Sequence, residues 1–278
     1  MKIIMIGHGM VGHKFIESVL EHVGDDVEIT ILAEEPRLAY DRVHLTEYFS
    51  GKSAKDLTLC RADFADAYGI DLRLNTKAVA IDQSHKTVTT NHGDVLSFDK
   101  LILATGSYAF VPPISGNDRE NCFVYRTIED LDAIRAASLN AKSGVVIGGG
   151  LLGLEAAKAL RDLNLETHVV EFAPRLMAVQ IDDLGGKVLR AKIENLGVKV
   201  HTQKATSSIE EGATTKHVMK FGDGSELETD IILFSAGIRP RDELARQSGL
   251  ALGERGGIMI NDYCQTSNPD IYAIGECA

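Results

Sequence analysis

Two stretches of the sequence share one pattern, and this repeat constrains the fold more than any other feature. Each is a short apolar run, then GxGxxG, then an amphipathic helical pattern: IIMIGHGMVGHKFIESVL from Ile3 and VVIGGGLLGLEAAKAL from Val145. Each is followed by a matched second segment, DKLILATG ending at Gly106 and DIILFSAG ending at Gly237. A lone GxGxxG is weak evidence, whereas four elements in the order A, B, A, B are specific. The repeat predicts two doubly wound α/β domains, each with a dinucleotide site at the carboxyl ends of its strands.

The glycines of the first turn have separate roles. Gly7 permits the tight turn, Gly9 lets backbone amides approach a pyrophosphate, and Gly12 lets the following helix pack closely on the strand. The helix N-terminus then faces the negative charge. His8 lies inside the turn and is interpreted as a backbone contact to phosphate. The residues expected to line this site are Gly7, His8, Gly9, Met10, Val11 and Gly12.

Two carboxylates end the next expected strand. The run VEITILAEE ends at Glu34 and Glu35, and a carboxylate there accepts hydrogen bonds from the hydroxyls of an adenosine ribose. We predict Glu34 as the ribose ligand and Glu35 as its solvated neighbour. The alternative is that both are only the polar end of a strand.

The second turn contains Gly148, Gly150 and Gly153, and its next strand, THVVEF, contains a carboxylate near its end, Glu171. A carboxylate at this point suits a free 2′-hydroxyl and repels a 2′-phosphate, so NADH is preferred over NADPH. Arg175 follows four residues later and would soften this discrimination.

Two dinucleotide sites in one chain indicate a particular division of labour. A reduced nicotinamide delivers two electrons together as a hydride, and a flavin takes two electrons and releases them singly. Tandem sites therefore indicate FAD in one domain and NADH in the other. Composition does not decide which site takes which cofactor.

Charge and cysteine usage exclude several other classes of function. The formal net charge of −11 argues against nucleic-acid binding, which needs a concentrated basic surface. The four cysteines, Cys60, Cys122, Cys264 and Cys277, are scattered singly, without CxxC or zinc-ligand spacing. They are interpreted as reduced thiols, and no metal site is expected in this chain.

No apolar stretch approaches the ~20 residues needed to cross a bilayer. The first residues, MKIIMIGHGMVG, lack the features of a secretory signal. We therefore expect a cytoplasmic protein without a membrane role.

The order of GxGxxG, YDR, ATG, the second GxGxxG and YAIGE resembles the two-dinucleotide flavoprotein reductases, which include ferredoxin and rubredoxin reductases. More narrowly, the chain resembles the N-terminal part of the NAD(P)H-dependent nitrite reductase large subunit. The segments that carry this second resemblance are EEPRLAYDRVHL, NCFVYRTIEDL, VIGGGLLGLEAAKAL, THVVEFAPRLM and SAGIRPRDELA. The resemblance implies two Rossmann-like domains, the second inserted in the first. By the same resemblance, FAD is expected to bind residues 1–113 and 255–278, and NADH residues 114–254.

The resemblance also implies flavin contacts. Ala78 meets the adenine through its backbone, and Gly275 and Glu276 match a GD motif whose acid binds the ribityl chain, with Glu here in place of Asp. Arg126 either touches FAD or is a surface arginine at a helix start. The FAD residues implied beyond the first glycine turn are Glu34, Glu35, Arg42, Ala78, Ala104, Thr105, Gly106, Arg126, Gly275 and Glu276.

For NADH, the resemblance places Leu151 and Leu152 at the pyrophosphate turn and Gly237 and Ile238 near the nicotinamide. Glu155 then lies near both reacting rings, or else is a solvated helix glutamate. No side chain is expected to act as acid, base or nucleophile, because hydride transfer between stacked rings depends on distance, orientation and exclusion of water.

The loop YDRVHLTEYF, residues 40–49, falls where disulfide reductases of this superfamily carry paired cysteines, and it has none. Electrons are therefore expected to leave the flavin directly, toward a metal centre or metalloprotein. The lysine that relatives place near the flavin falls at Glu47, so Glu155 lacks that partner. We expect Glu47 to point outward and Arg42 to supply the local positive charge. A flavin-facing role for His44 stays open.

The resemblance implies that this chain is the electron-input half of a nitrite reductase that makes ammonium, with iron–sulfur and sirohaem segments, or a small subunit, lying outside it. The chain alone then performs at most the transfer of a hydride from NADH to FAD. One alternative is a stand-alone NADH-dependent rubredoxin or ferredoxin reductase. Another is a dinucleotide-binding redox sensor without turnover.

Overall fold

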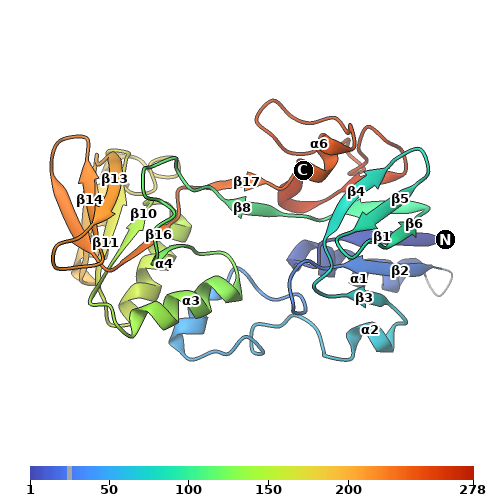
Figure 1. The fold of residues 1–278 in the computed structure, drawn as a ribbon, viewed down its shortest axis with the longest axis horizontal. Coiled ribbons are helices and arrows are strands. Elements are labelled where there is room, and N and C mark those ends of the chain that lie inside the picture. Colours follow the sequence, from blue (N-terminus) through green and yellow to red (C-terminus); the bar gives the residue numbers. More distant parts are fainter. Residues whose placement is uncertain (24–26) are drawn as a thin grey trace. The chain divides into compact units, whose positions relative to one another are not determined.

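The computed structural model describes residues 1–23 and 27–278. The chain divides into two compact units. Unit 1 comprises Met1–Arg42, Ala54–Tyr108 and Arg239–Ala278, and unit 2 comprises Val43–Ser53 and Ala109–Ile238. Two strands that include the later crossings between units, β8 (Ser107–Ala109) and β17 (Ile238–Pro240), pair with each other (Figure 1).

The expected domain ranges, 1–113, 114–254 and 255–278, follow the cofactor assignment and stay a prediction. The boundaries between the two compact units lie at other positions. Unit 2 also includes one segment that the sequence pattern does not indicate. Val43–Ser53 packs with unit 2, although the chain on both sides of it belongs to unit 1.

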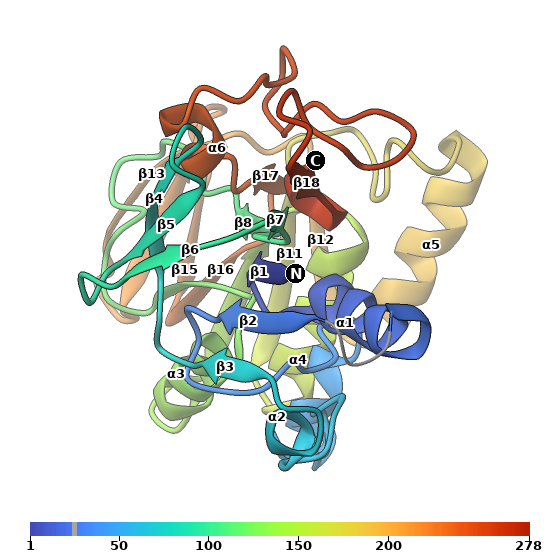
Figure 2. The same ribbon diagram turned by 90° about the vertical axis from the view of Figure 1, so that its right-hand side faces the viewer.

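Unit 1 is built on a five-stranded parallel sheet. Helices and loops cover both faces of this sheet, so its strands are apolar. In β1 (Lys2–Ile6), for example, every residue after Lys2 is buried. The order is β18 (Ile271–Ala273), β7 (Lys100–Leu103), β1 (Lys2–Ile6), β2 (Glu28–Leu32), β3 (Asp71–Arg73). Beside it lie an antiparallel sheet and short helices: β4 (Ala78–Asp82), β5 (Thr87–Thr90), β6 (Val95–Ser97), α1 (Met10–Val23), α2 (Phe64–Ala67), α6 (Glu243–Gln247) and η3 (Gly275–Cys277). Figure 2 shows β1, β2 and β3 in sequence beside α1.

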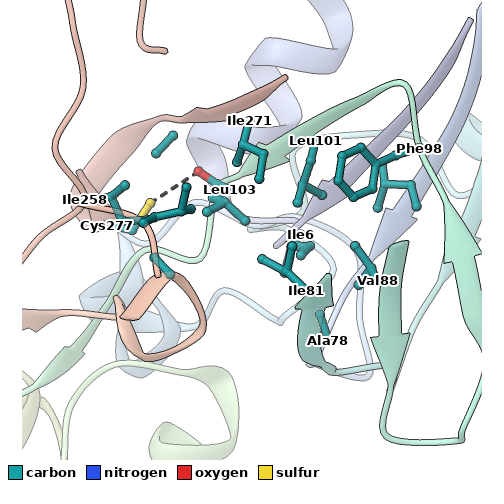
Figure 3. Packing of buried hydrophobic residues seen from close by; sticks show 14 of the residues in the cluster. Ile6, Ala78, Ile81, Val88, Phe98, Leu101, Leu103, Ile258, Ile271 and Cys277 are labelled. Carbon is teal, nitrogen blue, oxygen red and sulfur yellow. Dashed lines mark hydrogen bonds between the residues drawn. The ribbon is translucent and has the colours of Figure 1, made fainter. Parts of the chain in front are cut away.

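The unit 1 core joins distant parts of the chain. Ile81 and Val88 of the antiparallel sheet pack with Leu101 of β7 and Ile271 of β18 (Figure 3). Cys277 is buried in the same cluster, and its thiol donates to the carbonyl oxygen of Leu103 at 3.3 Å. All four cysteines are free thiols.

Unit 2 repeats this plan. Its parallel sheet has the order β12 (Val198–Thr202), β11 (Glu166–Glu171), β10 (Ser143–Ile147), β16 (Ile231–Phe234), β9 (Cys122–Val124). An antiparallel sheet and helices complete it: β13 (Thr206–Glu211), β14 (His217–Phe221), β15 (Glu226–Thr229), η2 (Leu45–Ser50), α3 (Ile128–Ser138), α4 (Leu151–Asp162) and α5 (Asp183–Asn195). The two sheets correspond strand for strand, which confirms the predicted fold class of two doubly wound α/β domains.

The outer strand beside β7 in unit 1 and the outer strand beside β16 in unit 2, here called the fifth strands, come from different places in the chain order. In unit 1 the fifth strand is β18, which follows all the other strands of its sheet, whereas in unit 2 it is β9, which precedes them. The segment 111–127 thus contains a sheet strand, β9.

The aspartate that begins each second matched segment fastens the central strand. Asp99 accepts the backbone N–H of Lys2 at 2.6 Å. Asp230 accepts the backbone N–H groups of Lys142 and Ser143 at 2.8 and 3.1 Å. The repeated aspartate therefore satisfies amides at the amino edge of each sheet, opposite the edge where the glycine turns lie.

Among the described residues, no helix is long and apolar enough to cross a membrane.

Candidate functional site

The first glycine turn is shaped by two close backbone approaches. Gly7 has φ +102°, and a Cβ there would lie 2.2 Å from the carbonyl oxygen of Ala104. A Cβ at Gly12 would lie 2.7 Å from the carbonyl oxygen of Gly7. Gly9 differs, because no described heavy atom lies within 4 Å of its added Cβ. The first and third glycines therefore hold the turn together, and the second leaves its backbone open.

The second turn has the same geometry. A Cβ at Gly148 would lie 2.2 Å from the carbonyl oxygen of Ser235, and one at Gly153 would lie 2.0 Å from that of Gly148. Around Gly150 the described chain again leaves the space open. Helix α4 begins at Leu151, which is 61% exposed, and Leu152 is half-buried. In unit 1, α1 begins at Met10, followed by the exposed Val11.

An open glycine directly before a helix suits a phosphate group. The first backbone N–H groups of a helix have no partner within it, and they carry the positive end of the helix dipole. A Cβ at either second glycine would fill the space through which an anion reaches them. Each unit thus has residues that fit a dinucleotide pyrophosphate.

The structure corrects the expected end of the second strand in unit 1. Strand β2 ends at Leu32, so Glu34 and Glu35 lie in the following turn rather than in the strand. The side chain of Glu34 is 46% exposed and is paired with Lys77 and Arg241, at 3.0 and 2.7 Å. Burial raises the pKa of the Glu34 carboxyl, but Lys77 and Arg241 outweigh it and lower the pKa.

Glu35 was expected to be the solvated neighbour, and this is wrong. Its side chain is 30% exposed, less than that of Glu34. It accepts a hydrogen bond from the Tyr40 hydroxyl at 2.8 Å and pairs with Arg42. These two partners, both in the YDR sequence, draw Glu35 inward.

In unit 2 the carboxylate contacts the glycine turn itself. Glu171 ends β11, and its oxygens accept the backbone N–H groups of Gly149 at 2.5 Å and Ala173 at 2.6 Å. Arg175 donates to Asp183 at 2.7 Å and to the carbonyl oxygens of Ile181 and Ala178.

The imidazole of His8 is buried beside the first turn, at 8% exposure. Neither of its ring nitrogens has a hydrogen-bond partner among the described residues. The ring of His13, on α1, lies 5.6 Å away and is buried too. Burial, and then His13, lower the pKa of His8 to about 4. The turn therefore lies next to an uncharged imidazole pair at neutral pH, which the sequence pattern did not indicate.

The second matched segment of unit 1 lies against the first turn. The approach of Gly7 to Ala104 brings the two segments together. Thr105 donates through its hydroxyl to the carbonyl oxygen of Arg241 at 2.7 Å, and a Cβ at Gly106 would meet no described atom within 4 Å.

The GD-like pair reaches the same place. A Cβ at Gly275 would lie 3.3 Å from the side chain of Val11, and the hydroxyl of Ser107 donates to Glu276 at 2.8 Å. Ala104 and Gly275 thus both lie against the first turn and the start of α1. Ala78 begins β4 in the same unit and is buried.

In unit 2, Gly237 has φ +110° with open space at its Cβ position, and Ile238 is 37% exposed. Arg126 directly precedes Thr127, the N-cap of α3, and its backbone N–H donates to Asp130 at 3.1 Å.

The charged residues expected around Glu155 each have partners in their own unit. Arg42 pairs with Glu35 in unit 1. Glu155 is half-buried on α4; burial raises the pKa of its carboxyl, and the charge of His44 partly opposes that rise. The side chain of Glu47 is 40% exposed and pairs with Lys52. Within unit 2, His44 is therefore the residue whose charge partly offsets the raised pKa of Glu155, and the role expected of Arg42 beside the flavin stays a prediction.

Comparison with known proteins agrees with this geometry. The chain is 55% identical to the nitrite reductase (NADH) large subunit of Escherichia coli over 279 residues, which are 100% of the chain and 33% of that protein. It is 29% identical to the rubredoxin-NAD(+) reductase of Alcanivorax borkumensis, over 99% of the chain and 72% of that protein. The chain thus spans about a third of the length of the nitrite reductase subunit, and the rubredoxin reductase is a more distant relative.

A solved structure gives the same result for the fold. The water-forming NADH oxidase from Lactobacillus brevis, bound to NADH, superposes with a TM-score of 0.91 at 27% identity, covering 100% of this chain and 62% of that one. The sequence pattern of one family matches residues 1–278, the whole chain. The resemblance to flavoprotein reductases is confirmed: the chain belongs to the pyridine nucleotide-disulphide oxidoreductase family and is an oxidoreductase.

Proposed function

We propose that this chain passes a hydride from NADH, bound at the second glycine turn, to FAD, bound at the first. The observation that carries the proposal is the matched geometry of the two turns. Each has an open second glycine in front of a helix, and each is braced by two backbone approaches that a Cβ would block. One chain with two such sites suits two dinucleotides.

When bound, the two cofactors supply the redox chemistry: the nicotinamide gives up a hydride and the flavin accepts it. The chain positions them. The amides at the start of α1 and α4 face the pyrophosphates. Around the flavin turn, Gly106, Gly275 and Glu276 complete the pocket, with Glu34 or Glu35 at the ribose. Glu35 is the less exposed of the two acids and is already oriented by Tyr40 and Arg42.

The preference for NADH over NADPH rests on Glu171. Its carboxylate is oriented by the N–H groups of Gly149 and Ala173, next to the turn that receives the pyrophosphate. An anionic group there accepts from ribose hydroxyls and repels a 2′-phosphate. Arg175 is bonded to Asp183 and to two carbonyl oxygens, so it offsets this repulsion little.

We further propose that the chain is the electron-input part of an enzyme that reduces nitrite to ammonium, in the cytoplasm, through an iron–sulfur cluster and a sirohaem held elsewhere. The support is the 55% identity to a nitrite reductase large subunit, against 29% to a rubredoxin reductase. The four free cysteines offer no disulfide to relay electrons, so the flavin passes them on directly.

Anaerobic mixing tests the first step. The FAD-loaded chain is mixed with NADH and the absorbance of oxidised flavin is followed. We expect bleaching by NADH and slower bleaching by NADPH. A flavin that is bound yet stays oxidised with NADH contradicts the proposal and favours a sensor without turnover. Nitrite added afterwards should not reoxidise the flavin in this chain alone.

A further inference from the structure

One segment of unit 2 directly follows residues that are held in unit 1. Val43–Ser53, here called the strap, belongs to unit 2, and the chain leaves unit 1 after Arg42 and returns to it at Ala54. The strap contains the short helix η2, which packs against α4. In Figure 1 it is the light-blue segment beside α3.

The strap is held in unit 2 at Tyr48, a buried side chain. The Tyr48 hydroxyl donates to the carboxylate of Asp132. Arg135 donates to the carbonyl oxygen of Tyr48 at 2.6 Å, and its guanidinium lies 4.1 Å from the centroid of the Tyr48 ring. Asp132 and Arg135 are three residues apart on α3, so one helix face holds both ends of Tyr48. These are charge-assisted and cation–π contacts, which are stronger than neutral ones.

Three more contacts hold the rest of the strap. Tyr125 is buried, and its hydroxyl donates to that of Thr46 at 3.2 Å. The rings of Tyr125 and Phe49 are stacked with centroids 6.3 Å apart. Ser50 donates to Asp162 on α4 at 2.8 Å.

The chain just before the strap is held in unit 1. Glu35 binds the hydroxyl of Tyr40 and the guanidinium of Arg42, and the backbone N–H of Arg42 lies 3.3 Å from the sulfur of Met10. Only two residues separate Arg42 from Leu45, where η2 begins. Fully extended, three residue steps span at most ~11 Å. The strap is therefore a short tie that ends in non-covalent contacts in each unit.

We propose that the strap, held by Asp132 and Arg135, is a positioning element for the hydride transfer. The paired strands β8 and β17 already join the units without intervening residues, so the strap acts as an additional tie that restricts orientation, and orientation positions the nicotinamide for transfer to the flavin. Unlike the two later crossings, this tie loosens when side chains release Tyr48. The inference rests on the proposed function, and Arg135, which acts through Tyr48, is a positioning residue.

The test uses Arg135→Gln and Asp132→Asn, with Arg190→Gln as the control. Arg190 is the matched arginine because, like Arg135, it donates to a backbone carbonyl oxygen in unit 2. It also pairs with Glu194 of its own helix, and none of its hydrogen-bond partners among the described residues belongs to the strap. The first readout is trypsin cleavage after Lys52, within the strap, which needs no cofactor. We expect faster cleavage in the two test variants, unchanged cleavage in the control, and partial recovery in Arg135→Lys, which keeps a cation.

The second readout is the rate of flavin bleaching at saturating NADH in the FAD-loaded chain. We expect a fall of about tenfold or more in the test variants, a modest share of what positioning contributes to such reactions. FAD content and NADH affinity should stay unchanged, since the glycine turns are not touched.

Two results would overturn the inference: unchanged trypsin cleavage at Lys52 in Arg135→Gln, or faster cleavage with bleaching at the wild-type rate. A wild-type chain whose bound flavin is not bleached by NADH contradicts the proposed function itself, and the role of the strap in that reaction with it. If only the strap inference fails, NADH still bleaches the flavin of the wild-type chain at its normal rate.

Discussion

Gly148 faces the carbonyl oxygen of Ser235 so closely that a Cβ would lie 2.2 Å from it. Gly148 also has φ +121°, where other residues are strained. We expect Gly148→Ala to lower the free energy of unfolding by ~2–4 kcal/mol, through steric overlap and backbone strain together. Chemical denaturation followed by circular dichroism measures the change.

Gly150→Ala is the matched substitution in the same turn. Gly150 has extended backbone angles, and its Cβ position is open among the described residues. We expect nearly wild-type unfolding but NADH affinity about tenfold weaker, because the methyl group occupies the space of the pyrophosphate. Titration calorimetry with NADH gives the affinity. Wild-type affinity in this variant would show that the nucleotide does not use the turn.

Asp230 should contribute stability that depends on pH. Burial raises the pKa of its carboxyl, but the backbone N–H groups of Lys142, Ser143 and Lys216 outweigh burial and lower the pKa. A depressed carboxyl pKa stabilises the fold above the unfolded pKa, and this stability is lost as pH falls through the folded pKa. Asp230→Ala should cost ~1 kcal/mol at pH 7 by removing the acceptor of these backbone N–H groups, of which that of Ser143 is part-buried.

The matching acid-titration experiment compares the Asp230→Ala variant with the wild type from pH 7 down to pH 2, because the loss falls below the ordinary carboxyl pKa of 3.8. Their unfolding free energies should converge as the wild-type carboxyl becomes protonated. A difference that stays constant over this range would show that the side chain acts through packing rather than through its charge.

The lowered pKa of His8 predicts a second dependence of folding stability on pH, at a less acid pH than that of Asp230. The His8 pKa is lowered from 6.5 to about 4, so the unfolded chain binds the proton more readily. Stability is full above pH 6.5 and falls as pH drops toward 4, by up to ~3 kcal/mol for this group. His8→Gln should flatten the profile over that window, and His22→Gln, at an exposed position of α1, should not. Equal slopes in all three proteins would contradict this origin.

Glu171→Ala should narrow the discrimination between the two nicotinamide cofactors. Loss of the carboxylate removes acceptors for the ribose hydroxyls and the repulsion of a 2′-phosphate. We expect weaker NADH binding and little change, or a gain, for NADPH. The ratio of their dissociation constants is the measurement. A ratio equal to that of the wild type would place the discriminating group elsewhere, with Arg175 as the next residue to change.

Much of the architecture could be predicted from the sequence, because the glycine pattern reflects steric contacts between each turn and its neighbouring strand. A Cβ is excluded at Gly7 and at Gly148 by the next strand of the same sheet, so each glycine indicates both a turn and a neighbour. The repeated aspartates were noticed as a pattern only. Their role at Lys2 and Ser143 needed the sheet register, which pairs residues far apart in the chain.

What the sequence missed depends on side chains that meet across long separations. The relative exposure of Glu34 and Glu35 follows from their pairing with Lys77, Arg241 and Arg42. The sequence around the two acids does not indicate which of these cations pairs with which acid. The strap was missed for the same reason. Tyr48 and Asp132 are 84 positions apart, and YDRVHLTEYF carries no periodicity that indicates a partner.

The placement of the fifth strands bears on how the chain folds during synthesis. Strand β9 is made before the other strands of its sheet, so unit 2 has all its strands once Phe234 has left the ribosome. Strand β18 is made last, and until then β7 has an unpaired edge. An open edge attracts other extended segments. The nascent chain therefore passes through a stage in which one sheet is complete and the other exposes the edge of β7, and a chaperone would bind most usefully there.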